Sequence, residues 1–195
     1  MSLRIHEIHP SLAHYPLALM PLSVIADIAG RLTGNANLMR LGGALMPIAA
    51  ATGAATAVAG LVAQSSVNVD EHGRAHDLLA THRNLNAGLL ALTGALAAYR
   101  ARTTRPSLGY LVAGALGAFA MNYTGYLGGS MVYQHGVGVL PAGGVDESRA
   151  PEIRGGNVAR SARVAGANAL HSLKHAGQHV MHGELAPALH DTHSS

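Results

Sequence analysis

Long apolar stretches separated by short polar segments occupy the first two thirds of the chain. The stretches cover residues 11–32, 41–64, 78–99 and 106–133. An α-helix needs roughly 20 mostly apolar residues to cross the hydrocarbon core of a bilayer. The pattern therefore predicts four transmembrane helices.

The segments between the predicted helices are short, covering residues 33–40, 65–77 and 100–105. Short loops place consecutive helices side by side in opposite directions. We therefore predict an all-α fold over residues 1–140, an antiparallel four-helix transmembrane bundle with both ends on one side. The alternative is a soluble all-α bundle with an apolar exterior, which is disfavoured because all four segments reach span length together.

The composition is that of a chain solvated by lipid. Charged residues make up 12% of the sequence, whereas soluble domains average about 25%. Gly and Ala fill the predicted helices, and small residues let helix backbones approach one another in lipid. The net charge of +3 is not gathered into a basic stripe, so the expected partner is the bilayer and not nucleic acid.

The predicted loops on the side away from the termini contain arginines and no acid. By the positive-inside rule these loops face the cytoplasm, which places both termini on the outer side. Two arginines of the tail, Arg149 and Arg154, act against this orientation. The loop arginines are Arg31, Arg40, Arg100, Arg102 and Arg105.

Residues 141–195 form a separate tail in this interpretation. A Gly-, Pro- and acid-rich linker covers residues 141–156, and a helix is expected over residues 158–185. Its histidines recur at helical spacing, which places them on one stripe where two can share Zn²⁺, Ni²⁺ or Cu²⁺. The alternative is a solvated polar face, because no carboxylate or cysteine completes the ligand set. The candidate metal ligands are His171, His175, His179 and His182.

The chain has 13 histidines and no cysteine. The lack of cysteine excludes disulfides, thiolate metal sites, iron–sulfur clusters and thioether-linked haem. Four histidines lie near those ends of the predicted helices that share the terminal side, so the topology places them in one layer. They are His9, His14, His82 and His135.

Neutral imidazoles buried in a helix bundle are suited to the axial positions of haem b. In this hypothesis Arg83 meets a propionate, Asn86 orients the ring of His82, and Gly88 and Gly129 leave room for the macrocycle. The alternatives are a transition metal held by the same histidines, or four separate histidines at the membrane interface.

Asp27 is the one acid within the predicted spans, and Arg31 follows it at i+4. That spacing predicts an ion pair within one helix. The sequence contains no nucleophile–base arrangement, phosphate-binding loop or pair of carboxylates, so a redox carrier is favoured over an enzyme.

Three short motifs resemble the domain-of-unknown-function 2231 family. HPSLAHYP (His9–Pro16) is similar to the start of that family, HRNLN (His82–Asn86) to its HxxxN element, and GGSMVYQHGVGV (Gly128–Val139) to its ending. The chain departs from the family at the end of the second span, where Gln64 and Ser65 replace a frequent acid.

The resemblance implies a multi-pass protein of the bacterial inner (plasma) membrane, with the termini in the periplasm if the arginine rule holds. It implies no activity, although some relatives lie beside redox modules. The leading hypothesis is electron transfer through haem b, with a redox protein as partner. The alternatives are transition-metal binding or transport, and a non-catalytic membrane subunit.

Overall fold

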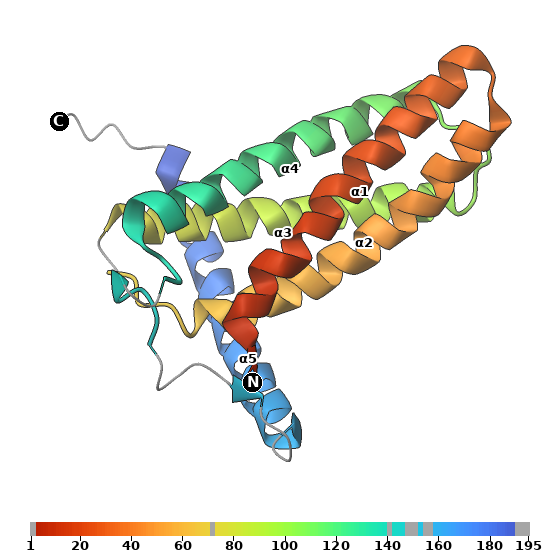
Figure 1. Cartoon of the computed structure of the whole chain (residues 1–195). Coiled ribbons are helices and arrows are strands. Elements are labelled where there is room, and N and C mark those ends of the chain that lie inside the picture. The colour runs from red at the N-terminus through yellow and green to blue at the C-terminus, as the bar shows by residue number, and fades with distance from the viewer. Residues whose placement is uncertain (1–2, 71–72, 140–141, 147–151, 154–157, 190–195) are drawn as a thin grey trace. The chain divides into compact units, whose positions relative to one another are not determined.

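The computed structural model describes residues 3–70, 73–139, 142–146, 152–153 and 158–189, of which residues 3–7 and 152–153 are described by their backbone alone. Five helices dominate the described chain, which confirms the predicted all-α class (Figure 1). They are α1 (Ile5–Thr33), α2 (Ala36–Gln64), α3 (Arg74–Arg100), α4 (Leu108–His135) and α5 (Val158–Met181). The short elements are β1 (Leu3–Arg4), β2 (Glu152–Ile153), which pairs antiparallel with β1, and the 3₁₀ turn η2 (Pro187–Leu189).

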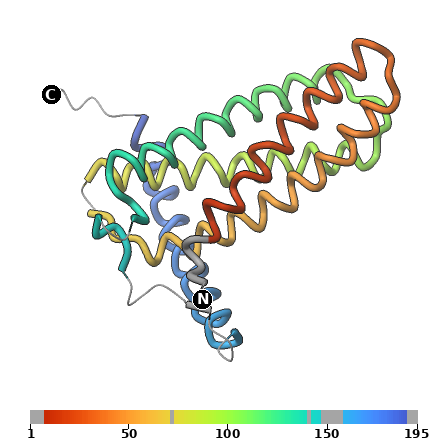
Figure 2. The backbone as a smooth tube through the Cα atoms, in the orientation of Figure 1, coloured from red at the N-terminus to blue at the C-terminus, as the bar shows by residue number. Residues whose placement is uncertain are grey.

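The turn between α1 and α2 is tighter than the sequence predicts. Only Gly34 and Asn35 separate the two helices, where a loop over residues 33–40 was expected (Figure 2). Gly34 has a φ of 71°, which glycine adopts without strain. The side-chain oxygen of Asn35 accepts a hydrogen bond of 2.9 Å from the amide of Asn37, which caps the start of α2.

Two of the four long helices have the length and apolar composition of membrane spans, at Ile8–Thr33 and Ala36–Gln64. Helix α3 begins with a polar half that contains Arg74, Asp77, His82 and Arg83. Helix α4 has no charged residue but is rich in Gly and Tyr. The four helices occur where the apolar pattern predicts them, whereas the crossing of the bilayer by α3 and α4 stays a prediction.

The chain divides into two compact units. Unit 1 contains residues 1–11, 57–85 and 126–195, and unit 2 contains residues 12–56 and 86–125. Each is described by itself.

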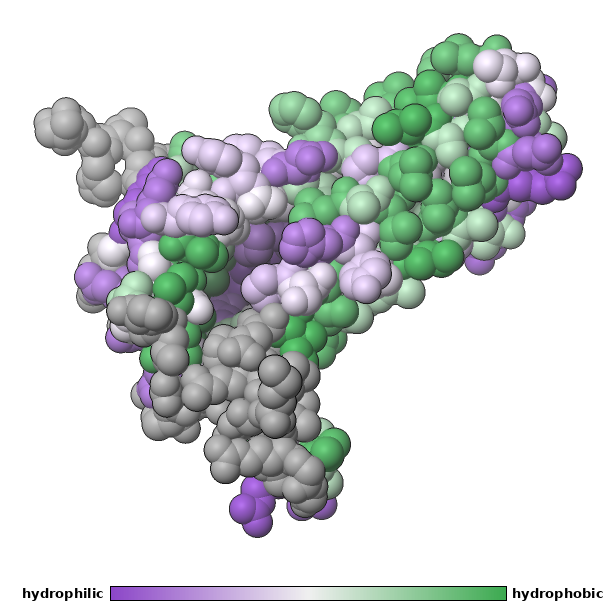
Figure 3. Space-filling model, viewed as in Figure 1, coloured by the Kyte–Doolittle hydropathy of each residue, from purple (hydrophilic) through white to green (hydrophobic). Residues whose placement is uncertain are grey.

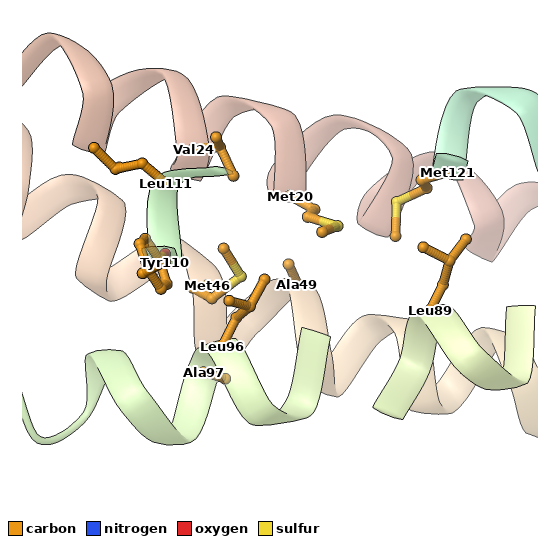
Figure 4. Close-up of a cluster of buried hydrophobic side chains, with 10 residues drawn as sticks. All are labelled: Met20, Val24, Met46, Ala49, Leu89, Leu96, Ala97, Tyr110, Leu111 and Met121. Atoms are coloured by element: carbon orange, nitrogen blue, oxygen red, sulfur yellow. The ribbon is translucent and has the colours of Figure 1, made fainter. Parts of the chain in front are cut away.

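Unit 2 is an apolar four-helix core. Met20 of α1 and Met46 of α2 are fully buried and meet side chains from α3 and α4 (Figure 4). Gly117 of α4 allows the close approach, because a β-carbon there would lie 2.6 Å from the methyl carbon of Met20. The other buried members are Val24, Ala49, Leu89, Leu96, Ala97, Tyr110, Leu111 and Met121.

The outer surface of unit 2 is also apolar. Ile25 of α1, Ile48 of α2 and Phe119 of α4 are 60%, 50% and 77% exposed. Figure 3 shows apolar colour over the visible faces of these helices in unit 2. A continuous apolar exterior of this kind is costly in water and suited to lipid, which agrees with the membrane hypothesis.

A buried ion pair crosses unit 2, and its partner differs from the sequence prediction. Asp27 pairs with Arg100 of α3 through two hydrogen bonds of 3.0 and 2.9 Å, whereas the expected partner Arg31 is exposed. Arg100 also donates to the carbonyls of Met39 and Thr103. The i+4 prediction was wrong because antiparallel packing brings a fully buried bidentate partner from another helix.

Glycines of α2 provide the space for this ion pair. A β-carbon on Gly42 would lie 2.4 Å from Oδ1 of Asp27, and one on Gly43 would lie 2.9 Å from Nη2 of Arg100. The carbonyl of Gly42 accepts a 2.7 Å hydrogen bond from the hydroxyl of Ser23. Helix α4 completes the surroundings, since the ring of Tyr110 lies 5.9 Å from the Arg100 guanidinium carbon.

In unit 1 the glycine-rich segment after α4 ends that helix. Gly136 has a φ of 64°, and the amides of Gly136 and Val137 donate to the carbonyls of Val132 and Met131 at 3.1 Å. Val137 is buried in a small core with Leu127 and Met131. The segment therefore has a structural role as a left-handed helix cap with an apolar anchor.

Candidate functional site

His9 packs against α2 in unit 1. A β-carbon on Gly60 would lie 2.9 Å from Cε1 and 3.0 Å from Nδ1 of His9, whereas Nε2 is 3.6 Å away. The imidazole is half-buried. Glycine at position 60 is therefore what lets this ring lie against the helix backbone.

His82 of α3 packs against α4 in the same way. A β-carbon on Gly128 would lie 3.3 Å from Cε1 and 3.8 Å from Nδ1 of His82, and no further atom of the ring comes within 4 Å. At the next residue, Gly129, a β-carbon would meet no atom within 4 Å, so space remains beside it. Both half-buried imidazoles thus turn their Nδ1–Cε1 edge to a glycine, and Nε2 is the nitrogen farther from it.

Arg83 follows His82 and has an incompletely satisfied guanidinium. Its Nε donates a 3.1 Å hydrogen bond to the side-chain oxygen of Asn84. Its Nη2 is buried and has no hydrogen-bond partner among the described residues. A buried donor without an acceptor is costly, so this atom is available to an anionic group such as a carboxylate.

The other two histidines of the predicted layer have different surroundings. His14 and His135 are exposed, and His135 is the last residue of α4. In the part of the chain that the structure describes, no three histidine, aspartate or glutamate side chains lie together as a metal site. The role of the four histidines as cofactor ligands stays a prediction.

Asn86 connects α3 to α4 in unit 2. Its side-chain oxygen accepts a 3.2 Å hydrogen bond from the hydroxyl of Thr124. Such a bond between helices is a usual role for an amide in a membrane bundle. The predicted orientation of His82 by Asn86 stays a prediction.

His171, His175 and His179 of the predicted stripe lie on α5, whereas His182 follows its last residue, Met181, so the helix ends before the predicted residue 185. The four histidines have different partners. The rings of His171 and His175 are 4.4 Å apart. His179 hydrogen-bonds Glu184, and its ring is 5.5 Å from that of His76. Nδ1 of His182 lies 2.7 Å from the carbonyl of Gln178. Of the stripe, His171 and His175 are the pair whose rings contact each other, and metal binding by them stays a prediction.

The end of the tail docks on α3 through contacts that the sequence did not reveal. The side-chain amide of Asn84 donates to the carbonyls of Glu184 and Leu185 at 3.1 and 2.9 Å. The buried hydroxyl of Thr81 accepts a 3.0 Å hydrogen bond from the amide of Ala188. Thr81 and Asn84 are three residues apart on one face of α3, which is the only signal that could have indicated the docking.

A hydrogen bond between His179 and Glu184 accompanies this docking. The hydrogen bond from His179 lowers the pKa of the Glu184 carboxyl below its usual value. Hydrogen bonding to the charged form of a carboxylate favours that form.

The structure is that of an α-helical membrane protein. Unit 2 has an apolar exterior suited to lipid, and unit 1 contains half-buried histidines. The chain belongs to the domain-of-unknown-function 2231 family, whose model, described as a predicted membrane protein, matches residues 5–141. No curated protein and no solved structure matches the chain. The match ends where the tail begins, so the residues that dock the tail belong to the family domain and the tail itself lies outside the match.

Proposed function

We propose that the protein is a membrane-embedded electron carrier that holds haem b through histidines of unit 1. The observation that carries the proposal is the shared arrangement of His9 and His82. Each ring is half-buried, lies against a helix glycine and keeps Nε2 as the nitrogen farther from that glycine. Nε2 is the nitrogen that would ligate iron, and histidine axial ligands suit a cysteine-free helical chain.

The residues around these histidines are suited to haem b. Arg83 offers a buried Nη2 without an acceptor, which suits a propionate. The space beside Gly129 would admit one edge of a flat macrocycle. When bound, haem b would supply a one-electron iron couple within the membrane protein. His9 and His82 would hold the iron, Arg83 would balance propionate charge, and a redox protein partner would deliver or accept the electron.

The test is the visible spectrum of the full-length protein purified in detergent from cells supplied with haem. The proposal expects a Soret band and, after reduction, an α-band. His9→Ala and His82→Ala should each reduce bound haem at least tenfold, because one axial ligand is lost. His135→Ala, at an exposed helix end, is the matched control and should retain the bands.

A second comparison tests whether ring position matters. Gly60→Ala should displace the ring of His9 and shift the bands or lower occupancy. Gly53→Ala on the same helix, where the nearest atoms are 3.7 and 3.8 Å from the new carbon, should not. A wild-type protein without haem bands, or wild-type haem content in His9→Ala and in His82→Ala, would overturn the proposal.

One observation favours transition-metal binding as a second function. The rings of His171 and His175 lie 4.4 Å apart on consecutive helical turns of α5. Two such imidazoles can share Cu²⁺, Ni²⁺ or Zn²⁺. Elemental analysis of the purified protein and of a His171→Ala/His175→Ala variant separates this function from haem binding, since only the metal content of the tail should change.

A further inference from the structure

Helix α5 has an apolar face that the other described residues leave exposed. Leu170 and Leu173 are each 56% exposed, and Val180 and Met181 are 41% and 87% exposed. These residues recur at i, i+3, i+10 and i+11, so they lie along one side of the helix. Ala159, Ala162, Gly166 and Gly177 continue that side with small residues.

The side of α5 next to the apolar face is basic. Arg163 and Lys174 border the apolar residues, and Arg160 lies just beyond them. All three are exposed, and α5 contains no acidic residue. The exposed His171, His175 and His182 follow on the same side.

The remaining face of α5 packs within unit 1. Ser161 and Ser172 are buried on that face. Directly after the helix, the tail is held by Asn84 and Thr81 of α3. Within the described part of unit 1, the helix is therefore fixed along one side and at its end, which leaves its apolar and basic sides exposed.

We propose that this exposed surface of α5 is a docking site for anionic phospholipid at the membrane–water interface. A helix with an apolar face beside a Lys- and Arg-rich face inserts its apolar side at the boundary of headgroups and acyl chains. The phosphates of anionic lipids complement Arg160, Arg163 and Lys174, while lipid chains cover Leu170, Leu173 and Met181. The inference is independent of haem binding and depends only on the protein residing in a membrane.

The charge of the helix selects lipid over a second copy of the chain. Pairing two α5 helices through their apolar faces would bring six basic side chains together without an acid to offset them. Like charges at a helix–helix seam oppose association. At an anionic bilayer surface, each basic residue instead increases the partition coefficient of the helix into the bilayer about fivefold.

The test uses the full-length protein reconstituted into nanodiscs. The chain has no cysteine, so Leu173→Cys can carry one environment-sensitive fluorophore. In discs with about one third phosphatidylglycerol, the label should shift to shorter wavelength and be quenched by lipids with a nitroxide near the headgroup. Asn168→Cys, on the face of the helix that contains the buried Ser161 and Ser172, is the matched control and should show neither change.

Neutralising the surface tests the electrostatic part. Arg160→Gln, Arg163→Gln and Lys174→Gln together should lower the ratio of inserted to free label by roughly tenfold or more. High salt or pure phosphatidylcholine should do the same. The proposal is overturned if the Leu173 label stays water-exposed in anionic discs, or if its shift is the same in anionic and neutral discs. It is also overturned if the shift depends on protein density and occurs without nitroxide quenching, which would indicate self-association.

Discussion

At the residue scale, glycines determine where polar side chains can be placed. Gly42 and Gly43 make room for the Asp27–Arg100 pair, and Gly60 and Gly128 make room for His9 and His82. In each case a β-carbon would meet the polar group at 3.3 Å or less. Glycine destabilises a helix by about 1 kcal/mol relative to alanine, and the polar contacts that it permits here offset this cost.

Loss of one member of the buried ion pair should strongly destabilise the protein. Asp27→Asn leaves the guanidinium of Arg100 buried without its counter-charge, and breaking such a pair costs about 3–5 kcal/mol. Thermal unfolding of the purified protein in detergent, followed by circular dichroism, measures the loss.

Arg31→Gln is the control for this prediction, because Arg31 is the partner expected from local spacing but is exposed. It should change stability by no more than about 0.5 kcal/mol. Equal destabilisation by both variants would mean that Asp27 depends on Arg31 and not on Arg100.

At the element scale, α3 combines two kinds of surface. Its first half binds the end of the tail through Thr81 and Asn84, and its second half contributes Leu89, Leu96 and Ala97 to the apolar core. The polar half explains why α3 lacks the overall hydropathy of a membrane span. The tail replaces lipid or water as the partner of that half.

The docking of the tail should weaken at acid pH. The pKa of Glu184 is lowered in the folded protein by the hydrogen bond from His179 and also by His76 of α3, so the unfolded tail binds protons more readily than the docked one. The stabilisation is therefore complete above the ordinary glutamate pKa of about 4.3 and is lost as the pH falls through the lowered value. A fluorophore on Leu189→Cys, read from neutral to acid pH, should report the release.

Glu184→Gln removes the titrating group and keeps the size of the side chain. In that variant the acid transition of the Leu189 label should be absent or shifted. An unchanged transition would assign the release to another group.

Some of these contacts could be predicted from the sequence and others could not, for physical reasons. The positions of the four long helices follow from apolar runs, because lipid-facing helices must be apolar around most of their surface. The partner of Asp27 could not be predicted, since i+4 spacing indicates only local neighbours and Arg100 arrives through tertiary packing. The tail contacts were missed because Asn84 binds backbone carbonyls, which leave no pattern in the sequence. For the histidines, topology indicated a common end of the bundle but not which rings are half-buried.

At the scale of the whole molecule, the distribution of charge bears on orientation. Arg100 is neutralised by Asp27, so the exposed arginines near the loops of unit 2 are Arg31, Arg40, Arg102 and Arg105. The basic residues of α5 begin at Arg160, more than 20 residues after α4 ends at His135. Positive charges act on orientation within about 15–20 residues of a span. Of the tail, only Arg149 and Arg154 fall in that range, and the four exposed loop arginines outnumber them.

We therefore expect the loop between α3 and α4 to face the cytoplasm. Single cysteines introduced at the exposed Thr104 and Ala142 test this in the cysteine-free chain. In intact bacterial cells a membrane-impermeant maleimide should label Ala142→Cys, and it should label Thr104→Cys only after permeabilisation. The reverse pattern would invert the orientation.

The two-residue turn at Gly34 and Asn35 has a consequence for biogenesis. Of the described helices, α1 and α2 have the length and apolar composition of membrane spans, and only two residues separate them. As the nascent chain leaves the ribosome, the two are expected to enter lipid together as one preassembled hairpin. The later, more polar α3 would then pack against this hairpin, so its predicted insertion would depend less on its own affinity for hydrocarbon.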